Sequence, residues 1–247
     1  MRGRKPPVVG DVAGSPGGRL RRSTERSAIS GAVLQLGLNE SAEGRPFTAA
    51  DLLDRDFDVL DMLLGHVVDA LGDTDRGLAA HEERSWEDDG RSRRLIVCNA
   101  DRLRGHPNPC VVGFFGQRTS DAGIGPLDEA NAQMVAEFEA YPGILSYGSH
   151  ELESGEWANL VLHDDPVDRE YWNRGERHAR AVRELAPIHY RTVRIHNARL
   201  TAPVLDEPSI HPIATKFWDY TAAGVVWRAE RRFGEEWSTH DGPPGGE

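Results

Sequence analysis

The chain from residue 109 to residue 200 reads PCVVGFFGQRTSDAGIGPLDEANAQMVAEFEAYPGILSYGSHELESGEWANLVLHDDPVDREYWNRGERHARAVRELAPIHYRTVRIHNARL. Four short runs within it are rich in β-branched and aromatic residues, as strands are. Two longer runs between them carry apolar residues at helical spacing. The order strand, helix, strand, strand, helix, strand is that of the ferredoxin-like βαββαβ unit. With right-handed crossovers it predicts an α+β fold, with one antiparallel four-stranded sheet and both helices on one face.

The ends of these elements are marked by residues that start or stop regular structure. Pro126 opens the first helix, the Asp-Asp-Pro sequence at 164–166 caps the second, and Pro187 ends it. Glu153-Ser154-Gly155 is a short loop whose glycine suits a hairpin. The predicted strands cover residues 110–118, 144–152, 156–163 and 189–200, and the predicted helices cover residues 127–141 and 167–186.

The residues before this unit predict a basic tail and an α+β extension. Residues 1–27 are rich in Gly, Pro, Ser and Arg and have no periodicity, which is typical of disorder. The extension has a strong helical pattern over residues 47–71, with Thr48 as its cap. The extension spans residues 28–108 and continues with a polar stretch at 73–94, expected to be loop and exposed helix, and a short buried strand at 95–98.

The residues after this unit predict a second extension, 201–247. Prolines at positions 203, 208 and 212 favour an extended linker at its start. TKFWDY at 215–220 and VVWRAER at 225–231 are typical of two short strands. The last ten or so residues, which end in THDGPPGGE, are expected to be disordered.

Composition bounds the class of protein. The 247 residues carry a formal net charge of −11, which argues against nucleic acid as a partner. No apolar run approaches the roughly 20 residues of a membrane helix. No apolar stretch of signal-peptide length follows the basic start, so we expect a cytoplasmic protein without membrane contact. Cys98 and Cys110 form no CxxC pair and are expected to be reduced and buried.

The hairpin of the second and third predicted strands is the most informative place for chemistry. If Leu152 lies opposite Trp157, one face of the hairpin is apolar and the other is polar. The apolar face then holds Leu145, Tyr147, Leu160 and Leu162, and the polar face holds Ser146, His150, Trp157, Asn159 and His163. An imidazole can move a proton near neutral pH and an amide can hold an oxygen. The alternative is an ordinary polar surface that faces solvent or another subunit.

The second predicted helix carries His178 on its inward, apolar side together with Trp172. A lone inward histidine is usually a packed residue bound to one backbone carbonyl. The alternatives are a general base and an axial ligand of a haem iron. His189 and His196, near the two ends of the last strand, are weaker candidates of the same kind. These histidines are too far apart for HxxxH, and HExxH is absent, so we expect no metal site.

The segments PCVVGFFGQR, YPGILSYGSHEL, EWANLVLHDD and YWNRGERHARAV, taken in this order, resemble the dimeric α/β-barrel superfamily, in particular its antibiotic-biosynthesis-monooxygenase-like branch. The resemblance covers about residues 109–200. It implies two sheets packed face to face in a homodimer, with a substrate pocket between sheet and helices. It also implies oxygenation without a cofactor, in which the deprotonated substrate reacts with dioxygen itself and the protein supplies a base, hydrogen bonds and a dry pocket.

The resulting functional prediction is a cofactor-independent oxygenase that acts on a small hydrophobic aromatic or polyketide-type metabolite. His178 and His150 are the candidate catalytic residues. The candidate substrate-binding residues are Asn159, Trp157, Trp172, Tyr147 and Phe115. Two alternatives stay open: a haem enzyme of the same superfamily, such as an aldoxime dehydratase or a peroxidase, and a non-catalytic dimer that binds a small ligand.

Overall fold

The computed structural model describes residues 32–73, 78–119, 123, 125–222 and 225–234. The two segments predicted to be disordered, residues 1–27 and the last ten or so, lie outside these ranges. The two cysteines are buried free thiols, as expected.

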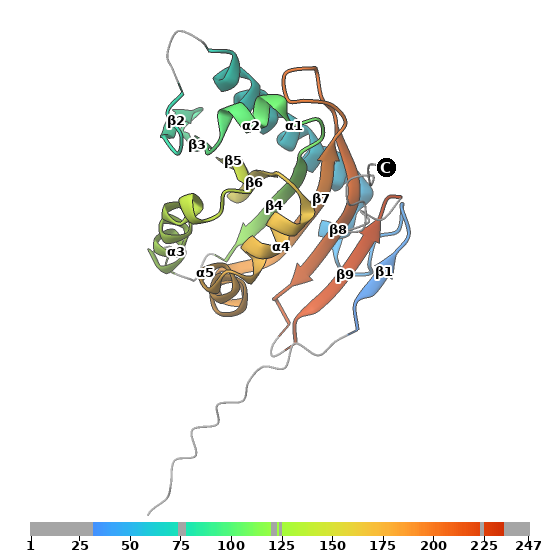
Figure 1. The fold of residues 1–247 in the computed structure, drawn as a ribbon. Helices are drawn as coiled ribbons and strands as arrows, with labels where there is room; N and C mark the ends of the chain where they lie inside the picture. The colour runs from blue at the N-terminus through green and yellow to red at the C-terminus, as the bar shows by residue number, and fades with distance from the viewer. Residues whose placement is uncertain (1–31, 74–77, 120–122, 124, 223–224, 235–247) are drawn as a thin grey trace, which may run out of the picture.

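One nine-stranded sheet dominates the described part of the chain (Figure 1). Its strands follow one another in the order β1-β9-β8-β7-β4-β6-β5-β3-β2, and every neighbouring pair is antiparallel except β1 and β9. The strands are β1 (Leu34–Leu36), β2 (Glu83–Asp88), β3 (Arg91–Val97), β4 (Cys110–Arg118), β5 (Ile144–Glu151), β6 (Glu156–His163), β7 (Tyr190–Leu200), β8 (Ile210–Asp219) and β9 (Trp227–Arg232).

The prediction of a ferredoxin-like fold with a four-stranded sheet is therefore wrong. The four strands that it contained, β7, β4, β6 and β5, lie side by side in the centre of a larger sheet. Both edges of that group are extended, because β3 pairs with β5 and β8 pairs with β7. An open edge strand presents a row of unpaired backbone groups, and the two terminal extensions supply partners for both rows.

Helices cover the two faces of the sheet unequally. In Figure 1, α3, α4 and α5 lie on the near side of the sheet and α1 runs behind it. The helices are α1 (Ala50–Gly72), α2 (Ala100–Gly105), α3 (Gly125–Ala136), α4 (Pro166–Arg174), α5 (Glu176–Arg180) and α6 (Ala186–His189). A π-helical turn (Ala181–Leu185) joins α5 to α6, and two 3-10 turns are Pro46–Thr48 and Phe138–Ala140.

The larger core lies between α1 and the sheet. Apolar side chains of α1, such as Leu60 and Leu63, pack on inward-facing residues of β4 and β6, such as Phe115 and Leu160. Gly113 on β4 makes this close approach possible, because a Cβ there would lie 2.5 Å from Leu60 Cδ1. Helix α1 thus covers the sheet face that the superfamily resemblance assigned to a partner subunit. The homodimer stays a prediction, and its two subunits would have to contact each other through a surface other than this sheet face.

A buried network of charged and polar side chains also fastens α1 to the sheet. Asp56 of α1 accepts two hydrogen bonds from Arg194, from Nε at 2.6 Å and Nη2 at 2.8 Å. His196 Nε2 lies 2.8 Å from Asp56 Oδ2, and its Nδ1 lies 2.9 Å from Thr215 Oγ1. Arg194 also pairs with Glu156 at 2.8 Å. His196 is therefore part of the packing between α1 and β7, and burial lowers its pKa.

Three predicted helical features differ from the structure. The predicted helix 167–186 is broken at Gly175, whose extended ψ of 137° ends α4. Pro187 lies inside α6 instead of ending the helical region. Thr48 does not cap α1: its hydroxyl donates to the Arg45 carbonyl and accepts from the Ala42 amide. The predicted cap by Asp165 is confirmed, with Oδ1 2.8 Å from the Asp168 amide nitrogen.

The stretch 73–94 was predicted to be loop and exposed helix, and this is wrong as well. Residues 83–97 form the β2–β3 hairpin. Its turn contains Asp89 and Gly90, both at positive φ (52° and 72°), the conformation that Asp-Gly favours in a two-residue hairpin turn. The polar side chains of β2 are compatible with a strand because β2 lies at the edge of the sheet.

Candidate functional site

A cavity of about 540 Å³ lies between the sheet and the helices α3 to α6, on the face opposite α1. Its floor is formed by outward-facing residues of β4, β6 and β7. The centre of that floor is apolar. Val112 of β4 pairs with Val161 of β6, and Phe114 of β4 pairs with Ile195 of β7. A cavity of this size with an apolar centre suits a small organic molecule.

The roof of the cavity contributes aromatic rings. Trp172 of α4 is held edge-on between Phe138, at 5.6 Å between ring centroids, and Tyr141, at 4.8 Å. Phe138 in turn contacts Tyr147 of β5 at 5.5 Å. The His178 imidazole lies 5.4 Å from the Trp172 ring. These rings fix the shape of the roof by edge contacts, the geometry that aromatic pairs prefer.

One end of the cavity is polar. It contains Arg169 and His178 from the roof and Asn197 and His163 from the floor. Arg169 Nη1 donates to Asn197 Oδ1 at 3.1 Å. His163 is 1% exposed, and its Nδ1 has no hydrogen-bond partner among the described residues. A buried polar atom without a partner at the wall of a cavity points to a bound molecule that supplies one.

Both imidazoles at this end are uncharged near neutral pH. Burial and, to a smaller extent, the positive charge of Arg169 lower the pKa of His163 to about 3. Burial also lowers the pKa of His178, while a hydrogen bond to the backbone of Asn173 raises it. A neutral imidazole can accept a proton, so the less strongly shifted His178 is the better candidate for a base.

Another part of the lining consists of Arg118, Trp157, Asn159 and Lys216. Arg118 lies 4.6 Å above the Trp157 ring and pairs with Asp128 at 3.6 Å. Asn159 is next to Trp157 on the same face of β6, and Lys216 is exposed on β8. Exposed lining residues of this kind indicate where the cavity opens to solvent.

The structure brings together five of the seven predicted site residues. Asn159, Trp157, Trp172, Tyr147 and His178 all line the cavity. His150 and Phe115 do not, because their side chains lie on the α1 face of the sheet. Phe115 is part of the core against α1. His150 is buried beside Arg93, and burial followed by the charge of Arg93 lowers its pKa.

The separation of His150 from Asn159 results from a wrong prediction of the hairpin register. Leu152 was placed opposite Trp157, whereas the structure pairs Glu151 with Trp157 and His150 with Ala158. A shift by one residue moves every side chain to the other face of a strand. Tyr147 thereby joins the cavity face, while Ser146 and His150 leave it.

Sequence reasoning missed Arg169 and Asn197, and it treated His163 only as part of a polar face. Arg169 lies on the second predicted helix, in the part that forms α4. It precedes Trp172 by three positions, and residues at this spacing share a helix face. This spacing was the signal that could have identified Arg169. The weaker candidate His189 is buried at the end of α6, outside the cavity lining.

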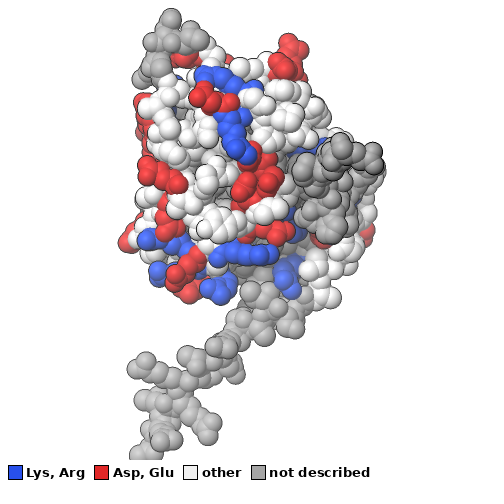
Figure 2. Space-filling view, viewed as in Figure 1, with Lys and Arg blue, Asp and Glu red and all other residues white. Residues whose placement is uncertain are grey.

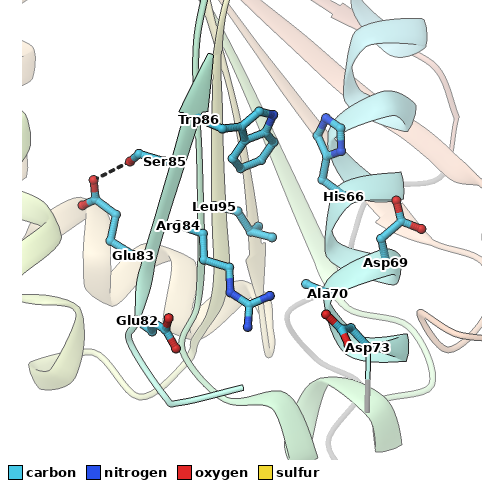
Figure 3. Close-up of a pocket in the computed structure, with 10 residues that line it drawn as sticks. All are labelled: His66, Asp69, Ala70, Asp73, Glu82, Glu83, Arg84, Ser85, Trp86 and Leu95. Atoms are coloured by element: carbon cyan, nitrogen blue, oxygen red, sulfur yellow. Dashed lines mark hydrogen bonds between the residues drawn. The ribbon is translucent and has the colours of Figure 1, made fainter. Parts of the chain in front are cut away.

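A second cavity of about 500 Å³ lies between α1 and the β2–β3 hairpin (Figure 3). Figure 3 shows Trp86 and Arg84 pointing toward α1, and Glu83 and Ser85 pointing away from it. His66 and Trp86 meet edge to face at 5.2 Å. Most of the other lining side chains are charged, and few are apolar. Small-molecule sites are usually apolar with a few polar groups, and the first cavity fits that description better.

The described residues offer neither a metal-binding cluster nor a membrane-spanning helix. They contain no group of three or more His, Cys, Asp or Glu side chains placed to hold a metal ion. None of the described helices is both long enough and apolar enough to cross a membrane.

His163 makes the stability of the fold depend on pH. Its pKa falls from 6.5 to about 3 on folding, so between these values the unfolded chain binds a proton that the folded chain excludes. The contribution of His163 to the free energy of unfolding is therefore complete above pH 6.5, and stability decreases as the pH drops from 6.5 toward 3. Urea unfolding at about pH 7 and about pH 5 should show that the wild type loses about 2 kcal/mol more than His163→Leu. Equal losses in the two proteins contradict a neutral, buried His163.

Comparison of the chain with family models, with curated proteins and with solved structures gives no match.

Proposed function

We propose that this protein is a cofactor-independent oxygenase that binds a small, largely aromatic molecule in the cavity between the sheet and helices α3 to α6. The observation that carries the proposal is the meeting of an aromatic roof and an apolar floor with two uncharged, buried imidazoles at one end. This is the combination that proton removal from an apolar substrate needs. The proposal includes the cytoplasmic location predicted from the sequence.

The roles of the residues follow from their positions. His178 accepts a proton from the bound substrate, because its imidazole is neutral and lies against the Trp172 ring. Arg169, at the same end, stabilises the negative charge that remains on the substrate. The apolar floor and the rings of the roof exclude water, so the anion is free to react with dioxygen.

The test is dioxygen uptake with α-naphthol and its hydroxylated and carboxylated derivatives. α-Naphthol and dioxygen give naphthoquinone and water, so an oxygen electrode and the quinone absorbance report the same reaction. We expect the wild type to accelerate uptake with a member of this panel. Replacing His178 with Ala should lower the rate by roughly a hundredfold, the lower end of the range for general bases. Val161→Trp, which fills the centre of the floor, should abolish the reaction.

The matched control is Val167→Trp, which adds the same ring at an exposed position of α4 outside the cavity. It should keep the wild-type rate. Uptake that no member of the panel raises above the buffer rate contradicts the oxygenase, and a rate unchanged by His178→Ala contradicts the base. A Soret band in the protein as isolated contradicts the cofactor-independent mechanism and supports the haem alternative.

A further inference from the structure

The charge of the cavity is opposite to that of the chain. The protein has a formal net charge of −11, and Figure 2 shows acidic and basic side chains interspersed over the face that carries α3, α4 and α5. The cavity, in contrast, is lined by one carboxylate, Asp128, and by four cations, Arg118, Arg169, Arg183 and Lys216. Since Asp128 pairs with Arg118, the other three cations give the cavity an excess of positive charge.

Arg169 is the cation that interacts with the floor residues of the polar end. Its guanidinium is half-buried and has no carboxylate within ion-pair distance among the described residues. It donates to the amide oxygen of Asn197 and interacts with Cys110 and His163 on the floor. A guanidinium has five N–H donors, and holding it away from water without an anion is unfavourable. The arrangement fits a site whose negative charge arrives with the ligand.

The second observation is the unpartnered nitrogen of His163. This side chain is almost completely buried, its Nδ1 has no hydrogen bond in the described structure, and it lines the same end of the cavity as Arg169. In the tautomer with its proton on Nδ1, it can donate to an oxygen that Arg169 also binds. Two donors from different layers then converge on one acidic group.

We propose that the ligand of this cavity is an aromatic carboxylate, with its carboxylate bound by Arg169 and His163 and its rings on the apolar floor beneath Trp172. The proposal rests on the cavity being the ligand site of the proposed function. We favour a singly charged carboxylate over a phosphate, because Arg169 is the lining cation that interacts with Asn197 and His163 at the polar end. Arg169 thus determines which ligand binds, in addition to the stabilisation of charge proposed above.

The experiment uses the full chain and a neutral fluorescent probe, N-phenylnaphthylamine, which reports occupation of the cavity. β-Naphthoate and the uncharged, similarly shaped β-naphthamide are titrated as competitors. For the wild type we expect β-naphthoate to bind at least about tenfold more tightly than β-naphthamide, since hydrogen bonds to a charged group contribute more than neutral ones. In Arg169→Met this preference should disappear, while the affinities for the probe and for β-naphthamide stay the same.

Arg174→Met is the matched control, because Arg174 lies on the same helix, is exposed and pairs with Glu170 outside the cavity. It should keep the full preference for the carboxylate. Equal affinity of the wild type for the two competitors contradicts the proposal of a carboxylate ligand. The proposal that the cavity binds a small aromatic molecule is then unaffected. If neither competitor nor the probe binds to the wild type, the proposed function fails too. A preference that survives in Arg169→Met contradicts the assignment of Arg169.

Discussion

Replacing Asp56 with Ala is expected to lower the free energy of unfolding by about 3–5 kcal/mol, the loss typical when one partner of a buried ion pair is removed. Asp56 is 3% exposed, and Arg194 and His196 beside it are equally inaccessible. Without the carboxylate, the two hydrogen bonds that Arg194 makes to Asp56 and the contact of His196 with it are lost together. Only Glu156 then remains to balance the Arg194 charge.

Urea unfolding of the full chain, followed by circular dichroism, measures this loss. The control is Asp54→Ala, which removes an exposed carboxylate from the same helix and should change stability by less than about 0.5 kcal/mol. Because the whole fold is stabilised by only about 5–15 kcal/mol, Asp56→Ala could leave too little folded protein to measure. Asp56→Asn keeps one hydrogen-bond acceptor and should lose less. A loss below about 1 kcal/mol in both variants disproves the importance of the network.

The second large effect is expected at Arg231, a fully buried residue of β9. Its guanidinium donates to three backbone carbonyls of the segment between β1 and α1: Gly37 at 3.1 Å, Thr48 at 2.8 Å, and Glu40. Replacing Arg231 with Met leaves these acceptors without a donor. Each unsatisfied buried group costs about 1–3 kcal/mol, so we expect a total loss of about 2–4 kcal/mol after partial rehydration.

This loss should be local as well as global. In Arg231→Met, hydrogen exchange should become faster in residues 34–48 before it does so in the central strands β4 and β6. Arg232→Met is the control, since Arg232 is exposed and pairs with Glu230 at the surface, where such a pair contributes up to about 1 kcal/mol. An unchanged exchange pattern in Arg231→Met contradicts the role of Arg231 as the anchor of this segment.

The central strands and parts of β3, β8 and β9 could be predicted from the sequence, while the edge strand β2 could not. Strands β4 to β7 are covered by other strands on both edges, so their residues follow a clear pattern of apolar positions. Strand β2, with the sequence ERSWED, lies at the sheet edge and has only Trp86 as a large apolar residue. Its hairpin was signalled only by Asp89-Gly90, a turn signal that outweighs the polar composition around it.

The candidate site was predictable to the extent that it depends on helical spacing. His178 and Trp172 lie inward, as that spacing predicts. The sheet side of the site depends on one register. A loop of three residues, Glu153 to Gly155, pairs Leu152 with Glu156, and the Leu152 amide does bind the Glu156 carbonyl at 2.8 Å. Placing Leu152 opposite Trp157 treats the loop as one residue longer, and composition alone does not reveal which loop forms.

Helix α1 has one consequence for the assembly of this protein. When helices cover only one face of a sheet, the opposite apolar face is exposed to solvent until a second subunit binds to it. The stability of such a fold then depends on protein concentration. Here α1 supplies that missing layer from within the same chain. Dilution of the protein therefore does not expose the apolar face of the sheet that α1 covers.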